Sequence, residues 1–381
     1  MFNTELGLFC HMHDNWRELL TQEPYNLKVS EDGPYVMFKY NQLTSDFNIP
    51  MVREARGIIF RRDDFSHPVC WPFLKFGNYG ESYAPEIDWS TAFVSEKVDG
   101  SLIKVWWDGE WKISTNGTID AYKADLNNVL MHEFGTYFYT TVCKHYDTFE
   151  AFTGVLDEDK TYMFELVGPY NRVVVPYDEP AVYFLGARNK YTGEEFNCSS
   201  VMAGALGMGG FKLPAHYSLS SVSDCVKAAD LKSWDDEGFV VCDAQFNRVK
   251  IKSPAYVMAH YARNNNVINR KHLIQIILSG ETEEFLCYAE DYKEELEKIQ
   301  GLMKAFCKVG DQIAKSCQRL YDIPKAVYAN WVKILPKIYQ DLAFRNYNNV
   351  MSTKDYTAGW TENKWETYLE SFEQLEEDLF G

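Results

Sequence analysis

The chain has 381 residues, enough for two or three domains, and a formal net charge of −17. Its hydrophobic fraction of 46% and aromatic fraction of 15% exclude a disordered chain, and its surplus of acid excludes a protein that coats nucleic acid through charge alone. No apolar run approaches the roughly 18 residues of a membrane span, and the first residues lack the basic start of a signal peptide. We therefore expect a cytoplasmic protein without membrane contact, whose nine cysteines, an odd number without a Cys-x-x-Cys pair, are reduced thiols.

The first third of the chain predicts a short helix followed by antiparallel hairpins. Apolar spacing favours a helix through 15–20, and turn residues with alternating apolar positions favour strands, two of which (102–107 and 111–115) flank the turn Asp108-Gly109. The strands expected here span 26–30, 34–40, 55–60, 91–96, 102–107 and 111–115.

The middle of the chain predicts one helix and further strands. Leu126, Val129, Leu130 and Phe134 follow helical spacing and predict a helix over 121–137. Strands are expected at 161–167, 172–175, 181–188, 237–242 and 248–252.

The pattern changes near residue 258. Strand signals end, and apolar residues follow a 3.6-residue period, including Trp365, Leu369, Phe372 and Leu375 in a last amphipathic helix. We therefore expect a β-rich domain over 1–258 and an all-helical domain over 259–381. Lysines and arginines between 298 and 345 meet few acids, which predicts either a surface that faces phosphates or an ordinary solvated helix face.

One short segment of the β-rich domain combines residue types that are typical of a catalytic site. In Lys97-Val98-Asp99-Gly100, alternation along an extended chain places Lys97 and Asp99 on one edge with Val98 toward the core. Gly100 would leave the backbone open to a large ligand such as a nucleotide. A lysine amine is a nucleophile once deprotonated, although a surface lysine paired with Asp99 is the plainer alternative.

Other charged residues lie on expected strands or rigid turns of the same domain. A metal–nucleotide complex needs cations to stabilise the phosphate charge and carboxylates to hold the hydrated metal and accept ribose hydroxyls. The sequence offers the cations Arg56, Lys75, Lys97, Lys250 and Lys252 and the acids Asp99, Glu165 and Glu237.

In these motifs the chain resembles the covalent nucleotidyltransferases, which include ATP-dependent RNA and DNA ligases and mRNA capping enzymes. The resemblance is carried by Lys97-Val98-Asp99-Gly100, Phe164-Glu165-Leu166, Glu237-Gly238-Phe239-Val240 and Lys250-Ile251-Lys252. The phage-type RNA ligase 1 branch is the most similar, through Arg56-Gly57-Ile58-Ile59-Phe60, Lys75-Phe76-Gly77-Asn78, Pro169-Tyr170-Asn171-Arg172-Val173-Val174 and Lys250-Ile251-Lys252-Ser253 with Tyr256.

The resemblance implies an α+β nucleotidyltransferase domain of antiparallel sheets with flanking helices, followed by an all-helical domain. It also implies a three-step reaction, in which Lys97 takes AMP from ATP, the AMP passes to an RNA 5′-phosphate, and a 3′-hydroxyl displaces it. The residues implied to contact ATP or the adenylate are Tyr40, Arg56, Lys75, Lys97, Glu165, Lys250, Lys252 and Tyr256, with Glu165 serving the ribose. Asp99 belongs to the catalytic motif, and Glu237 would help hold Mg²⁺ or Mn²⁺.

Glu283 and Glu284 resemble an acidic pair that binds a second metal in the family. The alternative is that Thr282 caps a helix whose first turn favours acids. Two positions depart from the family pattern: Asn116 stands where a lysine is expected, and Gly77 where a bulky aromatic is expected.

The partner implied is single-stranded RNA with 5′-phosphate and 3′-hydroxyl ends, a broken tRNA loop being one such substrate, and we expect a monomer acting in RNA repair in a host cytoplasm if a phage encodes it. The alternatives are a DNA ligase, a capping-type guanylyltransferase, or an inactive RNA-binding protein on the same scaffold. The first two usually add a small β-barrel after the last lysine motif, for which no run of short strands is visible.

Overall fold

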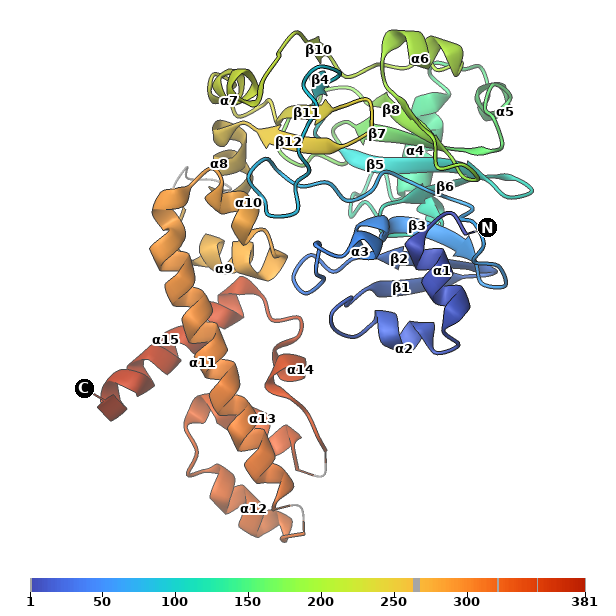
Figure 1. Cartoon of the computed structure of the whole chain (residues 1–381). Coiled ribbons are helices and arrows are strands. Elements are labelled where there is room, and N and C mark those ends of the chain that lie inside the picture. Colours follow the sequence, from blue (N-terminus) through green and yellow to red (C-terminus); the bar gives the residue numbers. More distant parts are fainter. Residues whose placement is uncertain (1, 263–267, 321, 348, 381) are drawn as a thin grey trace. The chain divides into compact units, whose positions relative to one another are not determined.

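The computed structural model describes residues 2–262, 268–320, 322–347 and 349–380. It divides the chain into two compact units, Met1–His260 and Tyr261–Gly381. The first contains antiparallel sheets with helices around them, and the described part of the second is helical (Figure 1). The expected α+β fold with a helical C-terminal region is confirmed.

The first unit is built from short elements. Its helices are α1 (Glu5–Met12), α2 (Trp16–Leu20), α3 (Pro50–Glu54), the 3-10 helix η1 (Ala121–Lys123), α4 (Phe134–Val142), α5 (Phe149–Thr153), α6 (Ser200–Ala205) and α7 (Val222–Asp230), and α8 (Pro254–Ala262) runs across the boundary between the units. Its strands are β1 (Lys28–Asp32), β2 (Tyr35–Lys39), β3 (Arg56–Arg61), β4 (Phe93–Glu96), β5 (Ser101–Trp107), β6 (Trp111–Thr115), β7 (Lys160–Val167), β8 (Ala181–Asn189), β9 (Glu195–Asn197), β10 (His216–Tyr217), β11 (Gly238–Cys242) and β12 (Arg248–Lys252).

The strands form three antiparallel sheets, with the orders β1-β2-β3, β10-β4-β11-β12 and β6-β5-β7-β8-β9. The predicted hairpins β1-β2, β5-β6 and β11-β12 are confirmed. The strands on either side of Lys97 do not pair with each other, because β4 belongs to the four-stranded sheet and β5 to the five-stranded sheet. The segment between them is therefore a crossing from one sheet to another.

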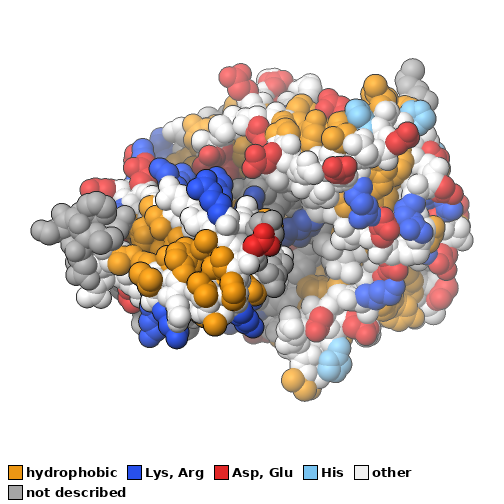
Figure 2. Space-filling view, turned by 90° about the horizontal axis from the view of Figure 1, so that it is seen from below, with side chains coloured by type: hydrophobic (Ala, Val, Ile, Leu, Met, Phe, Trp, Pro, Cys, Tyr) orange, Lys and Arg blue, Asp and Glu red, His pale blue; other side chains and the backbone are white. Residues whose placement is uncertain are grey.

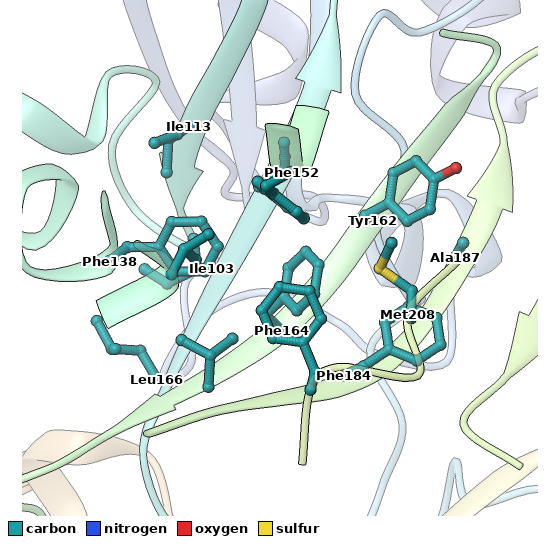
Figure 3. Packing of buried hydrophobic residues seen from close by; sticks show 14 of the residues in the cluster. Ile103, Ile113, Phe138, Phe152, Tyr162, Phe164, Leu166, Phe184, Ala187 and Met208 are labelled. Carbon is teal, nitrogen blue, oxygen red and sulfur yellow. The ribbon is translucent and has the colours of Figure 1, made fainter. Parts of the chain in front are cut away.

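The core of the five-stranded sheet is aromatic. Phe138 of α4 and Phe152 of α5 pack on Phe164 of β7, with ring centroids 5.5 and 6.0 Å apart, and Phe164 packs on Phe184 of β8 at 5.8 Å (Figure 3). Each fully buried phenylalanine contributes about 2–3 kcal/mol through its apolar area. This packing fixes β7, the strand that carries Glu165.

The predicted helix over 121–137 is wrong. The structure has η1 at its start and α4 from Phe134, while Val129 and Leu130 between them are 86% and 78% exposed. Polar side chains explain the difference: Asp125 accepts the backbone N–H of Asn127, and Asn128 accepts that of Leu130. Such local bonds compete with the helical hydrogen bonds and favour turns.

The predicted strand over 172–175 is also wrong, because this segment is irregular in the structure. The backbone N–H groups of Val174 and Val175 both donate to Oδ2 of Asp99, at 2.9 and 2.8 Å. A buried side chain thus takes the place of a neighbouring strand.

The second unit consists of α9 (Arg270–Ser279), α10 (Thr282–Leu286), the 3-10 helix η2 (Glu290–Tyr292), α11 (Lys293–Gln318), α12 (Lys325–Val332), α13 (Lys337–Arg345), α14 (Thr353–Thr357) and α15 (Glu362–Phe380). Trp365, Leu369 and Phe372 of α15 are buried, which confirms its predicted apolar stripe. Within the described ranges, none of the helices has both the length and the apolar character required to span a bilayer.

Apolar side chains are exposed around α12 and α13 of the second unit. Val327, Ile334, Phe344 and Val350 are among them. Figure 2 views this face and shows hydrophobic side chains gathered between lysine and arginine side chains.

Candidate active site

Lys97 and Lys252 share one carboxylate. The Nζ atom of Lys97 lies 2.7 Å from Oε2 of Glu237, and that of Lys252 lies 3.5 Å from Oε1 of the same residue. The side chain of Glu237 is 4% exposed and that of Lys97 is 22% exposed. The structure therefore brings together three predicted site residues from the crossing after β4, the start of β11 and the end of β12.

The backbone around Glu237 requires glycine at the next position. Gly238 has a φ of +125°, and a Cβ atom there would collide with the carbonyl oxygen of Ile251 on β12. The Gly238 carbonyl accepts the backbone N–H of Lys97 at 2.9 Å. This glycine lets β11 approach both neighbours closely, which fixes Glu237 beside Lys97.

Asp99 does not share an open edge with Lys97 as the sequence predicts. Its carboxylate is buried, with Oδ2 accepting from Val174 and Val175 and Oδ1 accepting from the hydroxyl of Tyr256 at 2.8 Å. All three bonds hold protein segments in place. Asp99 therefore positions the chain around the site, and Tyr256 owes its orientation to the same carboxylate.

Gly100 is close to a neighbouring strand, which corrects the expectation of an open backbone there. A Cβ atom at this position would lie 2.5 Å from the carbonyl oxygen of Leu166 and 3.1 Å from Cγ of Glu165. The glycine is needed because β7 passes against the crossing.

Glu165 lies in the electrostatic environment of the Lys97 cluster. Burial raises the pKa of its carboxyl group to about 8, the positive charge of Lys97 and Arg56 lowers it, and the negative charge of Glu237 and Asp99 raises it. A carboxyl group with this pKa is mostly protonated at neutral pH. It can then donate a hydrogen bond as well as accept one.

Arg56 begins β3 beside an aromatic ring. Its guanidinium carbon lies 5.0 Å from the ring centroid of Phe76, and its Nη1 atom is buried without a hydrogen-bond partner among the described residues. A buried, unpartnered guanidinium N–H costs free energy until an acceptor arrives. This group is thus suited to an incoming anion.

Lys75 lies among aromatic rings. Its ammonium nitrogen is 5.4 Å from the ring centroid of Tyr40, 5.1 Å from that of Phe47 and 5.9 Å from that of Tyr83. Its backbone N–H donates to the carbonyl of Arg53 at 2.8 Å. The sequence predicts Tyr40 and Lys75 as site residues, whereas Phe47 and Tyr83 give no signal of their own.

The loop after Lys75 joins β12. The N–H of Lys250 donates to the carbonyl of Gly77 at 2.9 Å, and the N–H of Tyr79 donates to the carbonyl of Lys250 at 2.8 Å. A Cβ atom at Gly77 would lie 2.9 Å from Oε2 of Glu81 and 3.1 Å from the ring of Tyr83. The place of an aromatic side chain at this position is thus taken by Glu81 and Tyr83.

Glu283 and Glu284 lie on α10 of the second unit. Glu281 occupies the N-cap position of this helix, so the structure does not show the cap at Thr282 that the sequence suggests. Glu284 is buried and Glu283 is exposed. Within the described residues, no group of three or more His, Cys, Asp or Glu side chains has an arrangement that could hold a metal.

Lys104 is a charged residue near the site that sequence reasoning missed. It is fully buried on β5, and its ammonium donates to the carbonyl of Gly57 at 2.5 Å. A lysine at alternate positions of a strand normally faces water. The sequence signal for its burial is Trp106, two residues later, because alternate residues of a strand share a face. Trp106 is also fully buried.

Comparison with known proteins identifies the family of the chain. The RNA ligase family model matches residues 54–256. A protein of Autographa californica nuclear polyhedrosis virus, named as a bifunctional polynucleotide kinase/RNA ligase, is 32% identical over 275 residues, which cover 68% of this chain and 38% of that protein. The RNA ligase of Rhodothermus phage RM378 is 28% identical over 345 residues, covering 76% of this chain and 77% of the phage protein.

Among solved structures, an archaeal ATP-dependent RNA ligase is similar with a TM-score of 0.46 and 14% identity, over 77% of each chain. The match to the family model covers more than half of the chain and includes every site residue described above from Arg56 to Tyr256. The chain belongs to the RNA ligase family.

Proposed function

We propose that the chain is an ATP-dependent RNA ligase that joins the 5′-phosphate and 3′-hydroxyl ends of single-stranded RNA. The observation that carries the proposal is the position of Lys97, a partly exposed amine 2.7 Å from a buried carboxylate that also pairs with Lys252. An amine with a second cation nearby suits attack on a phosphate. The site residues lie within the segment that matches the RNA ligase family.

The reaction has three steps. The amine of Lys97 loses a proton and attacks the α-phosphorus of ATP, so that a P–N bond forms and the P–O bond to pyrophosphate breaks. An oxygen of the RNA 5′-phosphate then attacks this phosphorus and breaks the P–N bond. In the last step the RNA 3′-hydroxyl loses its proton, attacks the 5′-phosphorus and releases AMP.

The protein contributes position and charge to each step. Arg56, Lys75, Lys250 and Lys252 would neutralise phosphate oxygens, and the unpartnered Nη1 of Arg56 offers a ready donor. Glu165 would bind a ribose hydroxyl, since its raised pKa gives it both a donor and an acceptor. Tyr40 would contact the nucleotide, while Asp99 and Tyr256 hold the surrounding chain.

A divalent metal fits the carboxylate of Glu237. Its Oε2 atom is buried and, although 2.7 Å from the amine of Lys97, makes no hydrogen bond of normal alignment with any residue that the structure describes. Mg²⁺ is usually held by one or two carboxylates together with substrate phosphates and water, and Mn²⁺ accepts similar ligands. When bound, such an ion supplies positive charge to the phosphates. A second site at Glu283 and Glu284 stays a prediction.

The helical unit would contact the RNA. Along α11 and its C-cap residue Arg319, four exposed cations (Lys304, Lys308, Lys315 and Arg319) are separated by four, seven and four residues. At 3.6 residues per turn these positions lie within about 60° of one another around the helix. One line of positive charge on an otherwise acidic chain suits a phosphate backbone. A tRNA substrate and a monomeric state stay predictions.

The test is covalent labelling. The protein is incubated with α-labelled ATP or GTP and Mg²⁺, then denatured, and the label on the chain is measured. We expect acid-labile label from ATP, lost in Lys97→Ala and kept in Lys123→Ala, which removes an exposed lysine paired with Asp32. A chain that takes no label from ATP would refute the proposed chemistry and favour an RNA-binding protein, and label from GTP would favour a capping-type enzyme.

A second assay identifies the polymer. The protein is given 5′-phosphorylated single-stranded RNA or a nicked DNA duplex under identical conditions. We expect faster sealing of the RNA. Faster sealing of the DNA nick would overturn the assignment to RNA and favour a DNA ligase.

A further inference from the structure

Lys104 has the most unusual environment of any lysine described in the first unit. Its side chain is fully buried, its ammonium donates to the Gly57 carbonyl, and the strand that carries it belongs to a different sheet from Gly57. It therefore ties the five-stranded sheet to the start of β3. That start carries Arg56.

Gly57 is the extra residue of a β-bulge. Phe38 pairs with Ile58 and Lys39 pairs with Arg56, so Gly57 has no partner on β2. Its φ is +79°, and a Cβ atom there would lie 2.8 Å from both the ammonium of Lys104 and the carbonyl oxygen of Asn116. Bulges re-aim the neighbouring side chain, and here that side chain is the Arg56 guanidinium.

The charge of Lys104 is not compensated by an acid. Among the described residues, the groups that act on it are Cys70, Arg56 and Lys39, and none of them is a carboxylate. Burial, together with the positive charges of Arg56 and Lys39, lowers the pKa of Lys104 to about 8. Cys70 itself stays a neutral thiol, because burial raises its pKa to about 11.

Two buried polar atoms around the bulge lack partners among the described residues. They are Nη1 of Arg56 and Oδ1 of Asn116. A buried cation without a carboxylate and unpartnered polar atoms both cost free energy of folding. The charge of Lys104 and the Nη1 donor of Arg56 suit a function in which an anion arrives from outside, whereas the Oδ1 acceptor of Asn116 needs a hydrogen-bond donor.

We propose that Lys104 is a positioning residue for nucleotide binding, which clamps the bulge at Gly57 and places fixed positive charge behind Arg56 so that the phosphates of ATP are held. Lys104 does not touch the nucleotide, since its side chain is sealed from solvent. The inference rests on the proposed function in one respect, that Arg56 meets the phosphates.

The changes in melting temperature and in the KM for ATP distinguish this role from a structural one. Lys104→Met keeps the length of the side chain and removes an uncompensated buried charge, so the melting temperature without nucleotide should stay equal or rise. The KM for ATP in labelling of Lys97 should rise about tenfold, with the rate at saturating ATP changed less than about twofold. A lysine that only supports the fold would give the opposite pair of results.

The pH profile gives a second readout. In the wild type, the KM for ATP should rise above about pH 8 as Lys104 loses its proton. Lys104→Arg keeps the charge and should remove this rise. Should arginine not fit the buried space, Lys39→Met serves instead, because loss of the neighbouring charge raises the pKa of Lys104 and moves the rise in KM to higher pH.

Calorimetry of ATP binding to the same proteins separates the two proposals. A wild type that binds ATP with Lys104-dependent affinity but takes no covalent label would refute the ligase chemistry and support the role of Lys104. A wild type that takes label, with a Lys104→Met variant of lower melting temperature and unchanged KM, would overturn the role of Lys104 and leave the ligase proposal standing.

Discussion

Lys97 and Lys104 lie seven residues apart in the chain, yet their ammonium groups are held in opposite ways. Lys97 is partly exposed and shares the carboxylate of Glu237 with Lys252. Lys104 is sealed from solvent, donates to a backbone carbonyl, and is influenced among the described titratable groups by two cations and a thiol. A paired, accessible amine can exchange its partner for a substrate, whereas a sealed and uncompensated amine contributes a charge that does not move.

The comparison divides the positive charge of the first unit into two kinds. Charge around Glu237 is partly balanced by that carboxylate and suits chemistry. Charge around Gly57 is unbalanced and suits attraction of an anion. Substitutions in the two regions should therefore have different effects on stability and on activity.

The largest effect is expected from Glu237→Ala. It leaves Lys97 and Lys252 without their shared partner, and loss of one member of a buried ion pair costs about 3 kcal/mol of unfolding free energy. The rate of lysyl-AMP formation should fall by about 10³, because the amine loses its position and the metal its carboxylate. Single-turnover labelling and urea unfolding measure the two quantities.

A double variant tests the pairing itself. Adding Lys252→Met to Glu237→Ala removes one of the two positive charges that Glu237 offsets, so part of the lost stability should return without recovery of labelling. Labelling at the wild-type rate in Glu237→Ala would show that the carboxylate is not part of the chemistry.

A smaller effect is expected from Gly57→Ala. The new methyl group would crowd the ammonium of Lys104 and the Asn116 carbonyl at a φ of +79°. We expect a loss of about 3 kcal/mol in unfolding free energy, together with weaker ATP binding. Gly109→Ala is a matched control, since Gly109 has a φ of +74° with nothing within 4 Å of the added atom.

This control separates the effect of the close contacts at Gly57 from the effect of a positive φ. Gly109→Ala should cost about 1 kcal/mol and leave ATP binding unchanged. Equal losses in the two variants, measured by urea unfolding, would mean that the contacts of Gly57 add nothing to its backbone conformation.

The smallest effect concerns Glu165. Its pKa is raised from 4.5 to about 8, so the folded protein holds this proton more tightly than the unfolded chain does. The stability that results is complete below about pH 4.5 and is lost as the pH rises toward 8. Relative to Glu165→Gln, the wild type should lose about 2 kcal/mol of unfolding free energy between pH 5.5 and 7. A pH-independent difference would contradict the raised pKa.

Hairpins with clear turn residues could be predicted from the sequence, because their pairing is local. β5-β6 and β11-β12 formed as expected. The structure of segment 121–137 could not be predicted in this way. The apolar spacing of Val129 and Leu130 fits a helix, but Asp125 and Asn128 accept hydrogen bonds from nearby backbone N–H groups and favour turns. The irregular segment 172–175 depends on Asp99, more than 70 residues away, which no local pattern reveals.

The site also contains features that local sequence predicts and features that depend on distant residues. Lys97, Glu237 and Lys252 stand in short motifs, and the sequence predicts them as site residues. The sharing of one carboxylate between two lysines depends on the order of strands in a sheet, and the burial of Lys104 depends on contact between two sheets. Both are properties of the assembled unit.

The carboxylate of Asp99 also sets the order in which the site can be completed during synthesis. It accepts hydrogen bonds from the N–H groups of Val174 and Val175 and from the hydroxyl of Tyr256. Tyr256 lies 157 residues after Asp99 in the chain. A nascent chain cannot close this arrangement until Tyr256 has left the ribosome. A truncated product that ends before Tyr256 would leave a buried carboxylate short of one donor.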